Sequence, residues 1–317
     1  MAALLVLAVA LATASAAAAA NGGFTPQFAH SPNTHNTNTV YYVVLGFTSA
    51  IFVIVEAALI LFIWKYRARG RTRAAEGQQV HGNTRLELLW TVIPVLILGV
   101  IAAIVFVQLP GITSAPASAA SAVKIKVEGH QFYWQFDYPN GARSINDLHV
   151  PVDQNVELEV VSYDVLHSWW IPQLAGKIQA VPGQTNHTWF RADKTGTFYG
   201  QCAELCGPFH EAMQARVISE SQADYQSFVD TRAAKSLGRA EFQGVCATCH
   251  GMQGQGGYGP ALASNSLLTQ RSALEALIRD GRGLMPPVAN SWTDGQIGAL
   301  VAYAKTHIYK GASTSGG

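Results

Sequence analysis

Two uninterrupted apolar stretches dominate the first third of the chain. They are VYYVVLGFTSAIFVIVEAALILFIW (40–64) and LLWTVIPVLILGVIAAIVFVQL (88–109). Each is long enough to cross a hydrocarbon core of about 30 Å as a helix. Pro94 is tolerated there because neighbouring helices in a membrane can satisfy the carbonyl that proline leaves free. Runs of this length favour a transmembrane hairpin over the buried helices of a soluble protein.

The segment between the two predicted spans is strongly basic. KYRARGRTRAAEGQQVHGNTR carries six Lys and Arg residues against one Glu, so the positive-inside rule places it in the cytoplasm. The N-terminus and everything after residue 111 then lie on the periplasmic or extracellular side of a bacterial inner (plasma) membrane. Residues 1–20, MAALLVLAVALATASAAAAA, predict a signal peptide, although the usual positive start is missing; the alternative is an Ala-rich extension. Residues 21–111 therefore form the N-terminal segment and both spans.

Short runs with β character follow a small-residue linker. The linker is ITSAPASAASA (112–122), and the runs are VKIKVEG, QFYWQFDY, NVELEVVSYDV, HTWFRA and GTFYGQC. Turn residues such as PNG and VPGQ separate them. We expect residues 122–220 to form an all-β sandwich or barrel.

The last third of the chain is helical in character. SQADYQSFVDTRAAKS predicts a linker helix within residues 221–237, and residues 238–310 form a further domain. Its final helix opens with the capping box TDGQ, in which Thr293 and Gln296 satisfy each other's backbone donors. The tail at 311–317, GASTSGG, is expected to be disordered.

Charge and cysteine content narrow the function classes. The 317 residues carry a formal net charge of +1, which gives no reason to expect a nucleic-acid partner. Four cysteines occur as two close pairs, too few for a disulfide scaffold of this size.

The second cysteine pair lies in CATCH (246–250), a C-x-x-C-H sequence typical of covalent c-type haem attachment. Cys246 and Cys249 are one helical turn apart and can meet the two vinyl groups of one haem. His250 then supplies an axial ligand. Met285, in GRGLMPP, is the expected second ligand, because Met252 is too close to His250 to reach the opposite haem face. His/Met ligation suits electron transfer.

The first pair lies in GQCAELCGPFHEAMQ (200–214), which could close a disulfide, hold zinc or hold copper. A disulfide leaves His210 and Met213 without a role, and methionine is not a usual zinc ligand. Thiolate, thioether and imidazole together select copper. A second histidine is needed, and His167, which we expect at the end of a strand, is the best candidate. The extra thiolate favours two coppers over one.

These residues carry a resemblance to a known family. DVLHSW, YGQCAELCG, FHEAM and GHQFYW behind two spans closely resemble subunit 2 of the haem-copper cytochrome c oxidases, and CATCH resembles the branch with a fused cytochrome c (caa type). The resemblance implies a two-helix transmembrane hairpin, a cupredoxin-like Greek-key β-barrel and an all-α class I cytochrome c domain. It implies a binuclear copper centre (CuA) with these ligands: His167, Cys202, Cys206, His210, Met213 and the Glu204 carbonyl. It further implies that the Glu204 carboxylate binds a magnesium shared with subunit 1.

The implied function is electron relay within a respiratory oxidase. A donor, either another c-type cytochrome or a quinol-oxidising complex, would reduce the haem c. Electrons would pass to CuA and then to subunit 1, where oxygen is reduced to water and protons are pumped. Subunit 1, other oxidase subunits and membrane lipid are the implied partners. A quinol oxidase subunit, a copper-carrying assembly protein and a nitrous-oxide-reducing enzyme are the alternatives, and each fits the full set of motifs less well.

Two further assignments come from the resemblance alone. Glu87 in RLELLW matches a carboxylate at the mouth of a proton pathway into subunit 1, although it could simply reach water near the end of the second span. Relatives that use a soluble cytochrome c commonly have tryptophan where this chain has Phe132, followed by Tyr133 and Trp134. These three residues are the candidates for electron entry. Our hypothesis is that the tethered haem is the donor to CuA and relaxes the need for that tryptophan; the alternative is ordinary aromatic packing that tolerates either ring.

Overall fold

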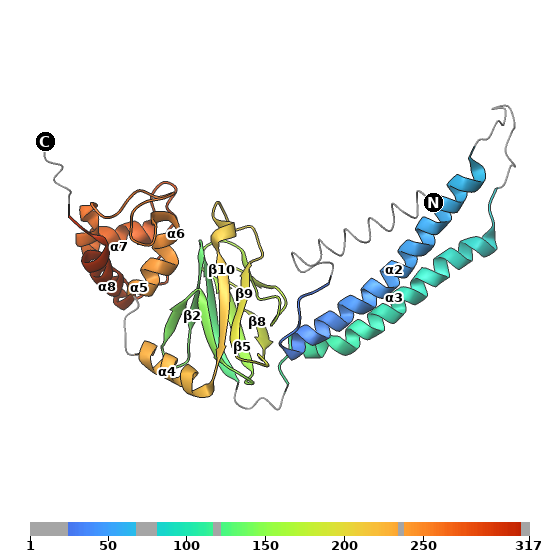
Figure 1. Cartoon of the computed structure of the whole chain (residues 1–317), viewed down its shortest axis with the longest axis horizontal. Coiled ribbons are helices and arrows are strands. Elements are labelled where there is room, and N and C mark those ends of the chain that lie inside the picture. The colour runs from blue at the N-terminus through green and yellow to red at the C-terminus, as the bar shows by residue number, and fades with distance from the viewer. Residues whose placement is uncertain (1–24, 68–80, 117–121, 234–237, 312–317) are drawn as a thin grey trace. The chain divides into compact units, whose positions relative to one another are not determined.

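The computed structural model of this chain describes residues 25–67, 81–116, 122–233 and 238–311 (Figure 1). The predicted signal peptide and all but the first residue of the predicted tail lie outside this part. The chain divides into two compact units. One is His35–Ile112, and the other combines the residues before it with those after it.

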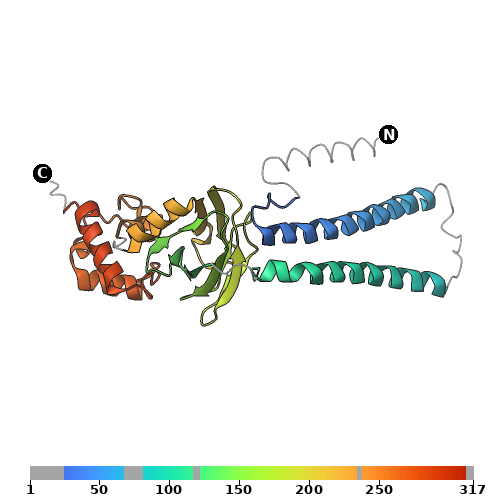
Figure 2. The same ribbon diagram turned by 90° about the horizontal axis from the view of Figure 1, so that it is seen from below.

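Two long helices form the transmembrane part. Helix α2 spans Pro32–Tyr66 and α3 spans Thr84–Thr113, each longer than the apolar run that predicts it. Their most apolar windows have mean hydropathies of 2.4 and 2.8, and they lie side by side in both views (Figures 1 and 2). A capping box starts α3. The side chain of Asn83 accepts from the Leu86 amide at 3.2 Å, and Glu87 accepts from the Asn83 amide at 3.1 Å.

The β-domain is a sandwich of two five-stranded sheets, with orders β3-β2-β1-β5-β8 and β4-β10-β9-β6-β7. The pairs β1/β5 and β4/β10 are parallel, and the other pairs are antiparallel. The strands are β1 (Val123–His130), β2 (Tyr133–Asp137), β3 (Arg143–Ile145), β4 (Asp147–Pro151), β5 (Val156–Ser162), β6 (His167–Trp170), β7 (Ile178–Ala180), β8 (Asn186–Phe190), β9 (Gly196–Cys202) and β10 (Gln214–Glu220).

Alternation along the strands builds the sandwich core. In β5, Val156, Leu158 and Val160 are fully buried between the sheets while the residues between them are less covered. In β1, however, Glu128 and His130 are also buried, although they point away from that core. Their burial means that something else covers the outer face of this sheet.

The expected strands all appear, but the sequence reasoning missed five others: β3, β4, β6, β7 and β10. Most are too short to show an alternating pattern. Strand β10 was missed because it directly follows the candidate metal ligands, which were assigned to a loop. The expectation that His167 ends a strand is wrong. His167 instead begins β6, after a loop that separates it from β5.

The C-terminal domain is helical. Helix α4 (Gln222–Ala233) precedes it, and its elements are α5 (Gly238–Glu241), a π-helical turn (Phe242–Cys246), α6 (Ala247–His250), a 3-10 turn (Ser266–Thr269), α7 (Arg271–Asp280), α8 (Asp294–Tyr303) and a second π-helical turn (Ala304–Ile308). The capping box predicted for α8 is confirmed. Ile297 and Leu300 on α8 are buried in the core of this domain.

The C-terminal domain also packs against the outer face of β1, β2 and β3. Tyr133 and Ile145 belong to the same apolar cluster as Phe242 and Trp292. Close approach at Gly244 is part of this contact, because a Cβ there would lie 2.4 Å from a methyl carbon of Ile145. This packing explains the burial of Glu128 and His130.

We predict that Gly200→Ala destabilises the β-domain. A Cβ at Gly200 in β9 would lie 2.0 Å from the carbonyl oxygen of Trp170 in β6, so the two paired strands would have to separate. Backbone shifts of this kind cost about 1–3 kcal/mol. Gly176→Ala is the control, since no atom lies within 4 Å of its added Cβ. Calorimetry showing equal unfolding temperatures for the two variants would contradict the prediction.

We predict that Glu241→Gln removes a pH-dependent loss of stability. Glu241 is fully buried, and burial raises its pKa from 4.5 to about 7, although Gln296 and the charge of Arg143 act in the opposite direction. Because the folded pKa is the higher one, the wild type is most stable below pH 4.5 and loses stability as the pH rises through 7. The loss is about 3 kcal/mol.

Thermal unfolding at pH 5 and pH 8 measures this effect. Glu241→Gln should unfold at a higher temperature than wild type at pH 8, with a much smaller difference at pH 5. Glu275→Gln is the matched control in the same domain, because Glu275 is partly exposed and paired with Arg279. A Glu241→Gln chain as pH-sensitive as wild type would refute the assignment.

Candidate metal centre

Strand pairing brings the two halves of the site together. In the β6/β9 ladder Trp169 is opposite Cys202, which places Cys202 near His167 at the start of β6. The loop after β9 then returns, because the Cys202 amide donates to the Met213 carbonyl at 2.9 Å just before β10. The loop between Cys202 and Met213 is thereby closed over the end of the second sheet.

Five candidate ligand side chains lie around one small space. The sulfurs of Cys202 and Cys206 are 3.9 Å apart, and both cysteines are free. The Cys202 sulfur is 3.9 Å from Nδ1 of His167, and the Cys206 sulfur is 3.5 Å from Nδ1 of His210. Sδ of Met213 is 3.8 Å from the Cys206 sulfur.

The backbone of Glu204 also faces this space. Its carbonyl oxygen is 3.2 Å from the Cys202 sulfur, as the expected ligand set requires. The site is therefore made by one strand start, one strand end and the loop between β9 and β10. All six groups that the resemblance implies as copper ligands gather there.

The two thiols differ in acidity, and Cys202 is the one that loses its proton first. A hydrogen bond from Cys206 lowers the pKa of Cys202 to about 3, and the same bond raises the pKa of Cys206. A bound metal ion would favour the deprotonated form of both cysteines, since each sulfur binds metal as a thiolate. The pair therefore releases protons when metal enters.

The donor set fits transition-metal coordination. Nitrogen and sulfur ligands lie about 2.0–2.3 Å from a tetrahedral metal, so neighbouring donors around one ion are about 3.3–3.8 Å apart. The sulfur–sulfur and sulfur–nitrogen distances here, 3.5–3.9 Å, are close to that range. Soft sulfur donors with imidazole are the set that copper prefers.

Asp164 orients His167, and the sequence reasoning missed it. Its Oδ1 lies 2.7 Å from Nε2 of His167, which leaves Nδ1 facing the cysteines. Although burial alone lowers the pKa of His167, the bond to Asp164 raises it overall. Asp164 also accepts from the Gln131 amide at 2.6 Å, and the Gln131 side chain donates to the Cys206 carbonyl at 2.5 Å. The D-x-x-H spacing was the available signal.

The three aromatic residues of the GHQFYW segment lie in different environments. Trp134 is fully buried, and its ring meets that of His167 edge-on at 5.9 Å between centroids. Phe132 is partly buried and contacts Phe209, the neighbour of His210, at 5.4 Å. Tyr133 points to the opposite side, into the C-terminal domain. Their role in electron transfer stays a prediction.

The C-x-x-C-H motif lies on consecutive helical turns. Cys246 ends the first π-helical turn, and Cys249 and His250 end α6. Nδ1 of His250 lies 2.7 Å from the Pro260 carbonyl, an arrangement that leaves Nε2 free to bind a metal. These residues fit a covalently attached haem.

Met285 and Met252 differ in position. Met285 is partly buried within the C-terminal cluster, whereas Met252 is 56% exposed. A cavity of about 430 Å³ lies beside Met285, lined by Gln131, Phe132, Pro208, Phe209 and the segment 280–287. The β-domain residues next to the cysteine loop thus share one cavity with the expected haem ligand.

Glu87 lies in the other unit, at the capping box of α3. That contact gives its carboxylate a structural role, and its place in a proton pathway stays a prediction. The Glu204 side chain is partly exposed next to the metal site, and a magnesium there likewise stays a prediction.

The fold and the site define a membrane-anchored copper protein of the cupredoxin type joined to a cytochrome c domain. Residues 143–220 match the family described as cytochrome c oxidase subunit II, periplasmic domain, and residues 19–107 match its transmembrane domain. Residues 233–303 match cytochrome c oxidase, cbb3-type, subunit III. The chain therefore belongs to the cytochrome c oxidase subunit 2 family and is part of a haem-copper terminal oxidase.

Individual relatives agree with this family. Cytochrome c oxidase subunit 2 of Alkalihalophilus pseudofirmus is 36% identical over 289 residues, covering 81% of this chain and 82% of that protein. Cytochrome c oxidase subunit 2 of Thermostichus vulcanus is 30% identical over 256 residues, covering 65% of this chain and 77% of that protein. The crystal structure of the periplasmic domain of subunit II from Bradyrhizobium japonicum is 35% identical, covering 35% of this chain and 92% of that one, with a TM-score of 0.34.

We predict that Asp164→Asn weakens copper binding by about 10- to 100-fold, the usual effect of losing a carboxylate behind a histidine ligand. Competition against a copper chelator measures the affinity, and the near-infrared band reports the site. Asp147→Asn is the control, because Asp147 pairs with Arg216 away from the ligands. Equal copper retention in the two variants would count against a role for Asp164.

Proposed function

We propose that this chain is the electron-accepting subunit of its oxidase, with its own haem c as the first acceptor. The C-terminal domain receives electrons from a c-type cytochrome or a quinol-oxidising complex. The β-domain takes them from the C-terminal domain and delivers them to subunit 1. Haem c and a binuclear copper centre, when bound, supply the one-electron redox chemistry.

The ligand set supports two coppers. Cys202 and Cys206 are both central, since each sulfur lies within 3.9 Å of the other and of one histidine nitrogen. A single blue-copper site uses one thiolate with two imidazoles and a distant thioether. With a second thiolate, Cys202 and Cys206 together would supply enough soft donors to hold two copper ions. His167 and Cys202 come from paired strands, and backbone hydrogen bonds close the loop that carries the other ligands, which favours a small change of geometry when an electron arrives.

The contact between the two domains supports direct transfer, and this observation carries the proposal. Phe132 and Phe209 line the same cavity as Met285. The ring of Phe209 also contacts that of Tyr258, nine residues after Cys249, at 4.9 Å. The haem-binding segments therefore lie against the residue that precedes the ligand His210. Phe132 and Phe209 therefore lie next to the C-terminal domain.

The proposal also includes a membrane topology, a magnesium site and a proton path. The basic residues between α2 and α3 support a cytoplasmic loop, with both C-terminal domains on the periplasmic side. The Glu204 carboxylate would hold magnesium with subunit 1, and Glu87 would stand at a proton path. Lipid contacts α2 and α3.

Removing the haem tests the proposal. In the purified oxidase, Cys246→Ala/Cys249→Ala should lose the covalent haem but keep the copper near-infrared band. Rapid mixing with a reduced soluble cytochrome c then measures the rate at which copper is reduced. This rate should fall by about tenfold or more relative to wild type, because the variant has lost a tethered haem whose effective concentration is on the order of millimolar.

Met252→Leu is the control, since this exposed methionine should not bind the haem iron. It should keep both the haem spectrum and the wild-type rate of copper reduction. If the haem-free variant reduces copper as fast as the control does, the chain's haem is not the donor to copper. A copper-replete wild type without a near-infrared band would overturn the binuclear assignment.

A further inference from the structure

Tyr133 is the most deeply placed contact between the β-domain and the C-terminal domain. It starts β2, is fully buried, and lies in an apolar cluster whose other members come almost entirely from the C-terminal domain. Its ring packs edge-on against Trp292 at 6.4 Å between centroids. The tyrosine is therefore a β-domain side chain inserted into the core of its neighbour.

The Tyr133 hydroxyl makes two hydrogen bonds there. It donates to the carbonyl oxygen of Val288 at 2.6 Å and accepts from Nε1 of Trp292 at 2.9 Å. The indole N–H of Trp292 can only donate, and the Val288 carbonyl can only accept. The single proton of the phenol therefore points to Val288. Burial raises the pKa of Tyr133, which keeps the phenol protonated.

Val288 is linked to Met285 by a stiff segment. Pro286 and Pro287 lie between them, and each has a fixed φ and no amide hydrogen. The Val288 amide donates to the Ile278 carbonyl of α7 at 2.9 Å, so α7 holds this segment from one side. Tyr133 holds it from the other side, through the Val288 carbonyl.

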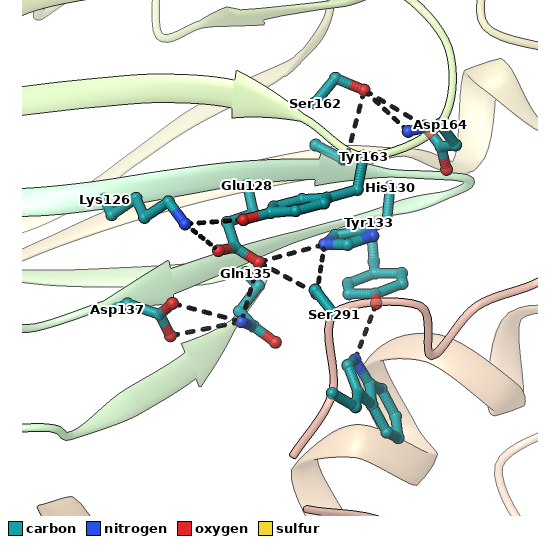
Figure 3. Close-up of polar contacts among 12 residues, drawn as sticks. Lys126, Glu128, His130, Tyr133, Gln135, Asp137, Ser162, Tyr163, Asp164 and Ser291 are labelled. Carbon is teal, nitrogen blue, oxygen red and sulfur yellow. Dashed lines mark hydrogen bonds and ion pairs between the residues drawn. The ribbon is translucent and has the colours of Figure 1, made fainter. Parts of the chain in front are cut away.

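Other contacts keep Tyr133 in place (Figure 3). Its ring stacks on that of His130, with centroids 4.8 Å apart. Oγ of Ser291, from the C-terminal domain, lies 3.2 Å from a carboxylate oxygen of Glu128 and 3.4 Å from Nε2 of His130. Glu128 is only 3% exposed and also accepts from Lys126 at 2.7 Å. The inserted ring thus rests on a buried polar row of β1.

We infer that Tyr133 is a positioning residue for Met285: the copper-binding domain holds the methionine loop of the haem domain from outside. The strength of the methionine–iron bond then depends on how the two domains are docked. Without the hydroxyl, the segment 285–288 loses its contact with the β-domain and keeps its attachment to α7 and the backbone bonds between Arg282 and Met285. This inference rests on the proposed binding of haem by Cys246 and Cys249, with Met285 as its axial ligand.

The test uses Tyr133→Phe in the full chain within the purified oxidase. Imidazole competes with a methionine ligand for ferric haem, so its affinity reports how firmly Met285 is held. Losing a buried hydrogen bond should raise the imidazole affinity by roughly tenfold. The weak red band of the methionine–iron bond should disappear at correspondingly lower imidazole, and the haem reduction potential should fall.

Two further variants separate positioning from general stability. Tyr138→Phe is the matched control: Tyr138 is 4% exposed in the same domain, and its hydroxyl accepts from the His149 amide at 2.8 Å, away from the haem domain. It should leave imidazole affinity unchanged. Trp292→Phe removes the donor that orients the hydroxyl, keeps an aromatic ring in this core position and should give a smaller rise. Combined with Tyr133→Phe, it should add little, because both act through one hydroxyl.

The outcomes distinguish this inference from the proposed function. A wild-type chain without covalent haem would overturn the proposed function, and this inference with it. Covalent haem with equal imidazole affinity in wild type and Tyr133→Phe would overturn this inference alone. An equal rise in Tyr133→Phe and Tyr138→Phe would also overturn it, because general loosening of the β-domain would then be the cause.

Discussion

The metal centre depends on the ladder between β6 and β9. This pairing is short, with Trp169 opposite Cys202 and Trp170 opposite Gln201, and it is extended by the Ala203 amide, which donates to the Ser168 carbonyl at 2.8 Å beside His167. The loop can then close because the Cys202 amide bonds to the Met213 carbonyl. Ligands from distant parts of the chain therefore share a site whose shape is set by backbone hydrogen bonds. A site held by backbone hydrogen bonds resists changes of shape, which is the condition for the small geometric change that electron transfer of the proposed kind requires.

A second constraint is the burial of polar groups on the outer face of β1 and β2. Lys126, Glu128, His130 and Gln135 would be ordinary surface residues in an isolated sandwich. Here Glu128 accepts from Lys126, Gln135 and Ser291, which satisfies a carboxylate that would otherwise be costly to bury. Since the Ser291 contact comes from the C-terminal domain, docking supplies part of this compensation. The polar row therefore specifies where the domain sits more than it adds to stability.

The sequence predicted the parts of this protein that rest on composition or on fixed spacing. Each of these signals lies in one continuous stretch of sequence and could be recognised directly. They are the two apolar spans, the capping box of α8, the C-x-x-C-H motif and the cysteine loop. The strand that begins at His167 could not, because four residues between turns show no period. Asp164 was missed since a carboxylate three residues before a histidine is common. The role of Tyr133 was invisible for another reason: its contacts, Val288 and Trp292, are defined only by the docking of two domains.

Docking changes how the fused haem domain should be understood. A flexible tether alone raises the local concentration of a donor, but each transfer then waits for a productive encounter. In this chain the C-terminal domain shares an apolar cluster and several buried hydrogen bonds with the sandwich. Such an interface fixes distance and orientation, so electron transfer of the kind proposed above would be limited by the contact and not by diffusion of the domain. With haem bound as proposed, the same interface would make the β-domain part of its environment, because Tyr133 reaches the segment that follows Met285. Fusion of the two domains thus allows one to influence the ligand field of the other, which separate proteins meeting transiently could not do.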